Sequence, residues 1–179
     1  MNSFEGYVKR HCNNYKKYWE IDSVRVKQDK IYVGYTFLYN KDDPYHDSQI
    51  RINSIKENYD ELITAINTYK DGKYMNSTLI VEYWNPGKYR NLRIQKNNIK
   101  DEYTNITYQL SERVEIPFKT FAEWFPKVNT LWLGRYDDLN ENISDITYFD
   151  DIRCLDAGKD LSEDNKKIIK AAFPNCIIN

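Results

Sequence analysis

The sequence predicts an α+β fold. An antiparallel sheet with one or two covering helices spans residues 1–117, and a short β/α solenoid segment, residues 118–179, packs against it. Three observations lead to this prediction. Runs of alternating β-branched and aromatic residues fill much of the first part. One stretch there has apolar residues at helical spacing. The C-terminal third of the chain repeats one short pattern at a constant spacing.

Residues 4–20 are predicted to form the first helix. Apolar side chains recur there at steps of three and four, which places them on one helix face: Val8, Cys12, Tyr15 and Trp19. A β-hairpin is expected next. Its strands, at 24–26 and 31–39, alternate β-branched and aromatic residues around a short polar turn.

The clearest helical pattern covers residues 57–70, with Ser54 or Asn58 as the N-cap and Gly72 at the C-terminal end. A tight turn at 85–88 is expected to join two of the antiparallel strands. The remaining predicted strands lie at 49–55, 78–84, 89–95, 106–110 and 114–116. The last two have weaker patterns and are expected at the edges of the sheet.

The C-terminal repeat begins at Phe125, Phe149 and Phe173, which are evenly spaced along the chain. A short apolar run follows each phenylalanine, and a helix-like stretch precedes it. The first two runs match position for position, down to the closing glycines Gly134 and Gly158. A period of about 24 residues, with one strand and one helical or 3₁₀ segment in each repeat, is typical of leucine-rich repeats.

This segment therefore resembles a short, degenerate leucine-rich-repeat array over residues 118–179. The resemblance implies that the strands present a surface for protein recognition. It also implies which side chains of the strands form the core: Leu131, Leu133, Leu155 and Ala157. The residues between and beside these positions are expected on the exposed face of the sheet.

Composition narrows the functional classes. The chain has 179 residues, of which 41% are hydrophobic and 30% charged, as in ordinary soluble proteins. A net charge of −1 argues against a general nucleic-acid binder, and no apolar stretch approaches the length of a membrane span. Three cysteines without CxxC spacing, and an N-terminus without signal-peptide order, predict reduced thiols and a cytoplasmic location.

The sequence predicts no enzyme, cofactor or metal. His46 lies among aspartates in a proline-broken loop, which is more typical of a solvated turn than of a metal site. His11 and Cys12 are adjacent on the first predicted helix, where neighbouring side chains point about 100° apart and cannot form a nucleophile–base pair with each other. No glycine-rich phosphate loop is present.

Two surfaces are candidates for binding a protein. On the repeat face, an aromatic and arginine cluster typical of interface hot spots is expected from Asn129, Trp132, Arg135, Tyr136, Arg153 and Asp156. The alternative is that Trp132 packs against the neighbouring domain. The second surface is the acidic loop 136–142 with Asp137 and Asp138, which would suit a partner with a basic surface, unless it is simply a solvated connection.

The hypothesis that follows is a non-catalytic protein-binding protein, such as an inhibitor or immunity protein that neutralises a bacterial toxin. One alternative is a nucleic-acid-binding module, although a buried sheet face is the commoner arrangement of such aromatic residues. In that alternative, the nucleic acid would bind an aromatic platform with basic neighbours, formed by Tyr35, Tyr39, Tyr83, Trp84 and Tyr89 with Lys88, Arg90 and Arg93. Another is a subunit of an oligomer, since the apolar end at 176–179 could pair with a second copy. Monomer and homodimer both remain open.

Overall fold

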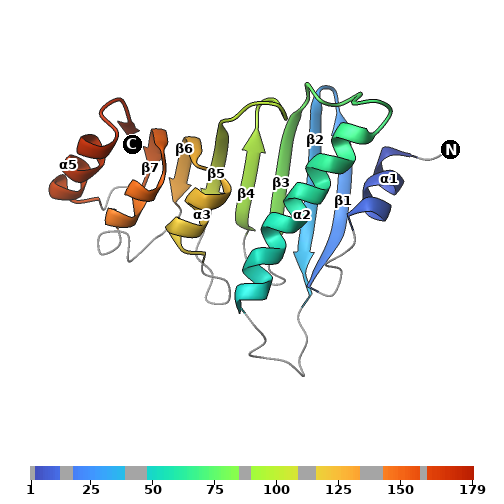
Figure 1. The fold of residues 1–179 in the computed structure, drawn as a ribbon, viewed down its shortest axis with the longest axis horizontal. Coiled ribbons are helices and arrows are strands. Elements are labelled where there is room, and N and C mark those ends of the chain that lie inside the picture. Colours follow the sequence, from blue (N-terminus) through green and yellow to red (C-terminus); the bar gives the residue numbers. More distant parts are fainter. Residues whose placement is uncertain are drawn as a thin grey trace. The chain divides into compact units, whose positions relative to one another are not determined.

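The computed structural model describes residues 3–12, 18–38, 48–84, 90–108, 116–133, 143–157 and 161–179. Both helices and strands are present, which confirms the predicted α+β class. The chain divides into two compact units, Met1–Asp101 (unit 1) and Glu102–Asn179 (unit 2) (Figure 1). The division lies before the predicted boundary at residue 117.

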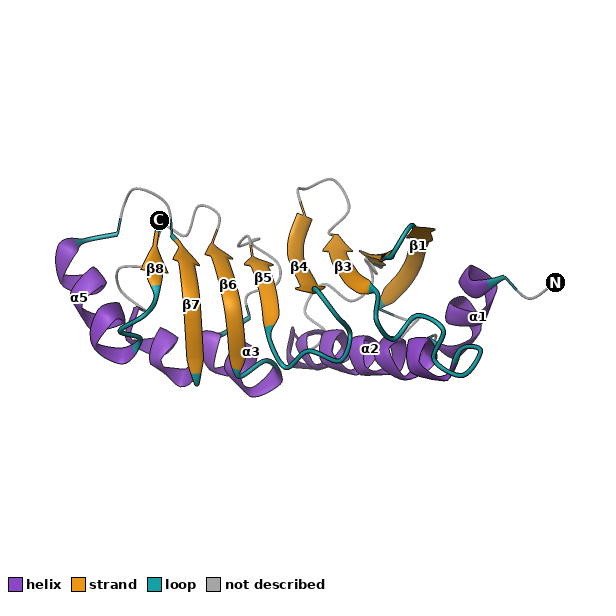
Figure 2. Ribbon diagram, turned by 90° about the horizontal axis from the view of Figure 1, so that it is seen from above, coloured by secondary structure: helices purple, strands orange, loops and turns teal. Residues whose placement is uncertain are grey.

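The described residues of unit 1 form two helices and four strands: α1 (Phe4–His11), β1 (Trp19–Lys27), β2 (Lys30–Phe37), α2 (Ser48–Thr68), β3 (Thr78–Trp84) and β4 (Arg90–Lys96). The pairs β1–β2 and β3–β4 are antiparallel, as predicted, but β2 and β3 are parallel. The sheet is therefore mixed. Parallel neighbours need a crossover, and α2 provides it along one face of the sheet (Figure 2).

Two predicted elements of unit 1 are wrong. The first helix ends at His11, and Trp19, which the spacing places on its apolar face, begins strand β1. Residues 49–55, predicted as a strand, form the first turns of α2. In this helix Ile52, Ile55, Tyr59, Leu62 and Ile66 are all buried at helical spacing. Neither predicted N-cap lies at the start of the helix, since Ser54 and Asn58 are buried within it.

An aromatic cluster forms the core between α2 and the sheet. The rings of Tyr35 and Tyr83 stack with centroids 5.1 Å apart, and Trp19 meets Tyr83 edge-on at 5.3 Å. The helix satisfies the polar atoms of two of these side chains. Trp19 Nε1 donates to Ser54 Oγ at 2.8 Å, and Tyr83 Oη donates to the carbonyl oxygen of Ile55 at 3.1 Å. A serine inside α2 is thus explained by its buried indole partner.

The chain leaves α2 through a turn in the left-handed region. Lys70, Asp71 and Gly72 have φ angles of 45°, 55° and 80°. Glycine adopts this conformation without steric cost, and Gly72 has the left-handed conformation predicted for it. The helix itself ends earlier, at Thr68, so Lys70 is the first left-handed residue after it.

Gly72→Ala is expected to lower the free energy of unfolding by about 1–2 kcal/mol, because an L-residue is strained at this φ. In addition, the new Cβ would lie 2.4 Å from Met75 Sδ, so that side chain must move. Urea unfolding of this variant beside Lys73→Ala, an exposed neighbour, measures the difference. Equal stability of the two variants would contradict the prediction.

Unit 2 alternates strands with helical segments: β5 (Thr104–Tyr108), α3 (Phe118–Trp124), β6 (Lys127–Leu133), η1 (Ile143–Tyr148), β7 (Asp151–Asp156), α5 (Glu163–Ala172) and β8 (Ile177–Ile178). Neighbouring strands β5 to β8 follow sequence order and are all parallel. Strand β5, expected at the edge of the first domain, pairs with β6 and so belongs to unit 2. Ile116 is not part of a strand.

The register of unit 2 follows the sequence repeat. Thr104 pairs with Val128, and all pairs between β6 and β7, such as Val128 with Ile152, advance by one period of the repeat. After Thr104 a register shift adds one residue between β5 and β6, and the pairs between β7 and β8 are one residue short of the period. The repeated phenylalanines, Phe125, Phe149 and Phe173, are buried. Two of them end helices in the same way: the N–H of Phe125 donates to Phe121 and that of Phe173 to Ile169. Membership of the leucine-rich-repeat family stays a prediction.

The predicted core positions of unit 2 are largely buried. Leu131, Leu133 and Leu155 are at most 3% exposed, whereas Ala157 is half-buried. Leu131 pairs with Ile106 on β5 and Leu155 on β7, which gives one continuous apolar row across the strands. Residues between the core positions therefore point to the opposite face.

Candidate functional site

The candidate site is the face of the unit 2 sheet opposite its helices, here called the open face. Segments α3, η1 and α5 lie on the other side of strands β5 to β8 (Figure 2). Two residues stand between the buried positions Val128 and Leu131 on β6, and between Ile152 and Leu155 on β7, so the regular alternation is interrupted there. Counted from the nearest buried residue, the side chains that point to the open face are Asn129, Thr130 and Trp132 on β6, and Arg153, Cys154 and Asp156 on β7. No described helix of unit 2 covers these residues.

One part of the open face is an ordered polar and aromatic cluster, here called the Tyr103 cluster: Glu102, Tyr103, Lys127, Asp151 and Arg153. Tyr103 Oη donates to Asp151 Oδ2 at 2.9 Å. The guanidinium carbon of Arg153 lies 4.0 Å from the centre of the Tyr103 ring, and Arg153 also hydrogen-bonds Tyr103 Oη. Because Tyr103 precedes β5 and both partners lie on β7, the cluster spans the three strands β5, β6 and β7.

A lysine on the middle strand extends the same cluster. Lys127 Nζ lies 2.9 Å from Glu102 Oε2 and 5.9 Å from the centre of the Tyr103 ring. The hydrogen bond that Lys127 donates to Glu102, together with the charge of that carboxylate, raises the pKa of Lys127. Arg153 keeps 55% of its side chain exposed, so it remains accessible while Tyr103 and Asp151 fix its orientation.

The structure places part of the predicted binding set on the open face. Trp132 pairs in register with Asp156 of β7 and Thr107 of β5, and both Trp132 and Asp156 are half-buried. Asn129 is half-buried and Arg153 is exposed. The other predicted binding residues lie outside the described ranges: Arg135, Tyr136, Asp137 and Asp138.

One correction concerns the partner of Arg153. The repeat register predicts it beside Trp132, but it stacks on Tyr103, which is not among the predicted binding residues. The repeat contained the necessary signal. Tyr103 lies one period before Lys127 and two periods before Asp151, so the repeat, extended one step upstream, places all three at equivalent positions.

The aromatic residues of unit 1 form the expected buried sheet face, and the alternative, an exposed aromatic platform, is contradicted for Tyr35 and Tyr83. Tyr35 and Tyr83 are each 1% exposed and belong to the core against α2. Trp84 is half-buried and follows Tyr83 directly, so its side chain points to the other face of the strand. Tyr39, Lys88 and Tyr89 lie outside the described residues, and the side chain of Arg90 is not described.

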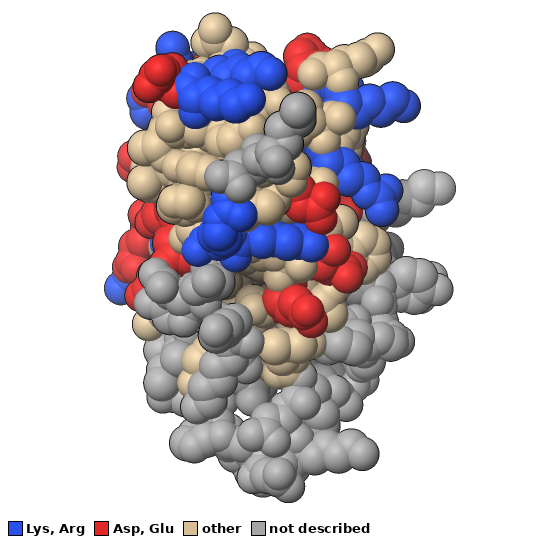
Figure 3. Space-filling model, turned by 90° about the vertical axis from the view of Figure 1, so that its right-hand side faces the viewer, with Lys and Arg blue, Asp and Glu red and all other residues tan. Residues whose placement is uncertain are grey.

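The charge on the end of unit 1 is mixed. Basic and acidic side chains stand next to one another there, without one continuous basic patch on the described surface in view (Figure 3). Opposite charges also pair elsewhere in unit 1: Arg93 Nε on β4 lies 4.0 Å from Glu82 Oε1 on β3. A surface that attracts the phosphate backbone of a nucleic acid is typically basic over a wide area.

The residues of α1 do not form a nucleophile–base pair. His11 Nδ1 lies 2.8 Å from the carbonyl oxygen of Tyr7, and its ring stacks on the Tyr7 ring at 3.9 Å. Cys12 is buried, and its burial, together with the charge of Glu61, raises the thiol pKa to about 12. A thiol with this pKa is protonated at neutral pH and is a poor nucleophile.

Within the described ranges, no group of three or more His, Cys, Asp or Glu side chains could hold a metal ion. His46, Asp42, Asp43 and Asp47 lie outside those ranges. None of the described helices is long and apolar enough to cross a membrane.

Comparison of the chain with protein-family models, with curated proteins and with solved structures gives no match.

Proposed function

We propose that this chain is a non-catalytic protein-binding protein that contacts its partner through the open face of unit 2. The observation that carries the proposal is the combination of Tyr103, Trp132 and Arg153 on one sheet face that no described helix of the unit covers. Tyrosine, tryptophan and arginine are the residues most enriched among interface hot spots.

The ordering of the Tyr103 cluster favours binding. A free arginine side chain loses about 0.5–1.5 kcal/mol of conformational freedom when a partner immobilises it. Arg153 already stacks on Tyr103 and lies 3.4 Å from Asp151 Oδ2, measured from Nε. A partner that accepts this arginine therefore meets a side chain with less freedom left to lose.

The proposed partner is a protein with a basic surface. Three acidic residues, Glu102, Asp151 and Asp156, accompany Lys127 and Arg153 around the open face, and Asp137 and Asp138 follow β6 in the sequence. An inhibitor or immunity protein that neutralises a bacterial toxin would have this design. That role is an analogy from size and surface, since a fold does not define a function. A cytoplasmic location, consistent with three unpaired cysteines, belongs to the same proposal.

Affinity capture from a lysate of the source organism tests the proposal. We expect the wild-type chain to retain one protein, and the Trp132→Ala/Arg153→Ala variant to lose it. Removing two hot-spot side chains, each contributing about 2 kcal/mol or more, weakens binding by about three orders of magnitude. The captured protein, once identified by mass spectrometry, would be purified and titrated calorimetrically against both chains.

The matched control is Trp84→Ala/Arg93→Ala, which removes the same residue types from the sheet of unit 1. This control should retain the partner, and circular dichroism should show both double variants folded. If the open-face variant binds as well as the control does, the open face is not the binding surface. Recovery of nucleic acid in place of a protein would overturn the proposed function itself.

A further inference from the structure

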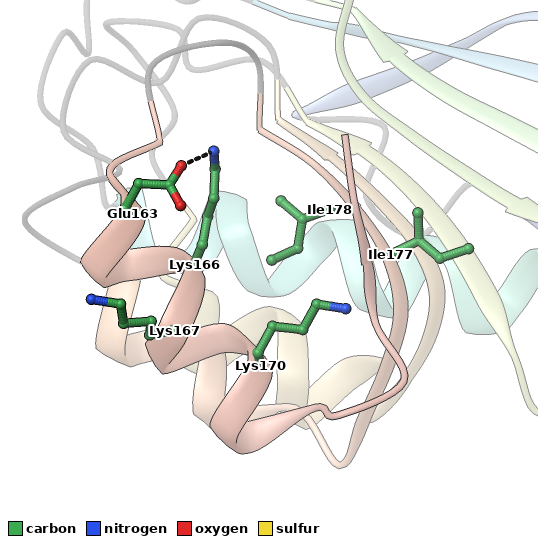
Figure 4. A pocket seen from close by; sticks show the side chains of 6 residues that line it. All are labelled: Glu163, Lys166, Lys167, Lys170, Ile177 and Ile178. Carbon is green, nitrogen blue, oxygen red and sulfur yellow. Dashed lines mark hydrogen bonds and ion pairs between the residues drawn. The ribbon is translucent and has the colours of Figure 1, made fainter.

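A second surface of unit 2 lies between α5 and the last strand. Here a groove of about 540 Å³ is lined by Glu163, Lys166, Lys167, Lys170, Ile177 and Ile178 (Figure 4). The lining combines three lysines from the helix with two isoleucines from β8. Lys170 points toward β8, whereas Lys167 points away from it (Figure 4).

Strand β8 pairs with β7 on one side only, and no described strand lies on its other side. The N–H of Asn179 donates to the carbonyl oxygen of Leu155 at 2.9 Å. Backbone groups of alternate residues point in opposite directions in a strand, so those of Cys176 and Ile178 point to the free edge. The backbone groups of Cys176 already have hydrogen-bond partners. Its N–H donates to the carbonyl oxygen of Phe173, and its carbonyl oxygen accepts from Lys170 Nζ.

Ile178 therefore presents one N–H and one C=O at the free edge of β8. The backbone of an added strand could form hydrogen bonds with both of these groups. The adjacent Ile177 is 62% exposed and is one of the few large apolar side chains exposed in the described part of the chain. It pairs with Cys154, so it points to the open face, whereas Ile178 pairs with Leu155 on the helix side.

The spacing of the lysines matches a strand. Lys166 and Lys170 are one helical turn apart, roughly 6 Å along α5. Two residues of a strand span roughly 6.6 Å. Carboxylates at alternate positions of an added strand would therefore face the helix side beside these two lysines, and the residue between them would face Ile177.

We propose that the edge of β8 binds an extended acidic segment of another protein as an added strand. Its acidic residues, two positions apart, pair with Lys166 and Lys170, and the apolar residue between them covers Ile177. Lys166 Nζ already forms an ion pair with Glu163 Oε1 at 2.6 Å. Because this pair lies at the surface and contributes little stability, a carboxylate of the bound segment can replace Glu163. This mode of recognition is β-strand addition, in which backbone bonds give affinity and side chains give selectivity.

The same features disfavour a second copy as the occupant. Two copies paired through β8 would bring Lys166, Lys167 and Lys170 of both chains together at one edge. Like charges placed opposite one another at an interface weaken association. An acidic segment instead brings the charge that the groove lacks. This proposal does not use the open-face residues Tyr103, Trp132 and Arg153, and it does not rest on the function proposed above.

The test is a titration of the full ¹⁵N-labelled chain, followed by amide chemical shifts. The probe is a capped peptide with the sequence Thr-Glu-Val-Glu-Val-Glu-Thr, and the comparison peptide has lysine in place of each glutamate. We expect the acidic peptide to shift the amides of residues 176–179 and of α5. The Lys166→Glu/Lys170→Glu variant should bind it at least about tenfold more weakly and should bind the lysine peptide instead.

Three further variants make the result specific. Lys119→Glu, an exposed charge reversal on α3, should bind the acidic peptide as wild type does. The Trp132→Ala/Arg153→Ala variant should also bind it, which separates this proposal from the open-face proposal. Ile178→Pro removes the free N–H and should abolish binding.

The proposal is overturned if both peptides bind equally, if the acidic peptide causes no shifts, or if the shifts lie outside α5 and residues 176–179. It is also overturned if sedimentation shows a dimer of the wild type that Ile178→Pro abolishes, because a second copy would then occupy the edge.

Discussion

Replacing Leu131 with alanine is expected to lower the free energy of unfolding of unit 2 by about 3 kcal/mol. Leu131 has 0% of its surface exposed and lies between Ile106 and Leu155 in the central apolar row. Parallel strand pairing holds the neighbouring residues on both sides, so they cannot move fully into the space that the truncated side chain leaves. Loss of the side chain therefore leaves a cavity in addition to the lost burial.

Thr130→Ala is the matched control, since it truncates the preceding residue of the same strand on the open face. We expect this control to change the free energy of unfolding by less than about 0.5 kcal/mol. Urea unfolding gives the total change, and hydrogen exchange locates it, with the amides of unit 2 losing more protection than those of unit 1. A Leu131 variant no less stable than the Thr130 variant would show that this row is not the core.

The repeat is the part of the fold that the sequence predicts best. Phe125, Phe149 and Phe173 mark positions where three successive strand–helix steps bury the same side chain. A constant period requires one structural solution to recur, so the pattern constrains each strand through its neighbours. The same periodicity would have identified Tyr103, had it been extended upstream of the first apolar run.

The errors in unit 1 come from short patterns. Ile50 and Ile52 alternate as in a strand, yet they lie in the first turns of α2, a helix whose apolar stripe continues through Leu62 and Ile66. A longer stripe outweighs a two-residue alternation because it buries more surface. Trp19 likewise fits the spacing of a preceding helix, but it belongs to a strand, where its indole reaches Ser54.

The pairing direction of β2 and β3 was also predictable in principle. A helix as long as α2 between two strands is typical of a parallel crossover. For the aromatic platform, Tyr83 and Trp84 are consecutive in a strand and cannot share a face. In contrast, the stacking of Arg153 on Tyr103 depends on side-chain geometry across three strands, and local sequence does not encode it.

Alkaline pH is expected to destabilise unit 1 by several kcal/mol through groups buried beneath α1 and α2. Burial, followed by the charge of Glu61, raises the pKa of Cys12 from 9.0 to about 12. Burial is also the main cause that raises the pKa of Tyr35 and Tyr83 well above 10.0. The unfolded chain releases these protons at lower pH than the folded chain does, so rising pH favours the unfolded state.

The pH window follows from the sign of these shifts. The contribution of Cys12 is fully present below pH 9.0, and it declines as the pH rises toward about 12. Over that range the free energy of unfolding should fall by about 1.4 kcal/mol per pH unit for each such group. Lys96 acts in the opposite sense, because burial lowers its pKa and its charge disfavours the folded state below that value.

Urea unfolding between pH 8 and pH 11 measures this dependence, and Cys12→Ala isolates the thiol. The variant is expected to lose stability less steeply above pH 9 than the wild type. Val8→Ala, which truncates a buried residue of α1 without removing a titratable group, should be less stable at every pH but keep the wild-type slope. Equal slopes for the Cys12 and Val8 variants would mean that the thiol ionises in the folded chain. Cys12 would then be accessible to solvent and not packed in the core.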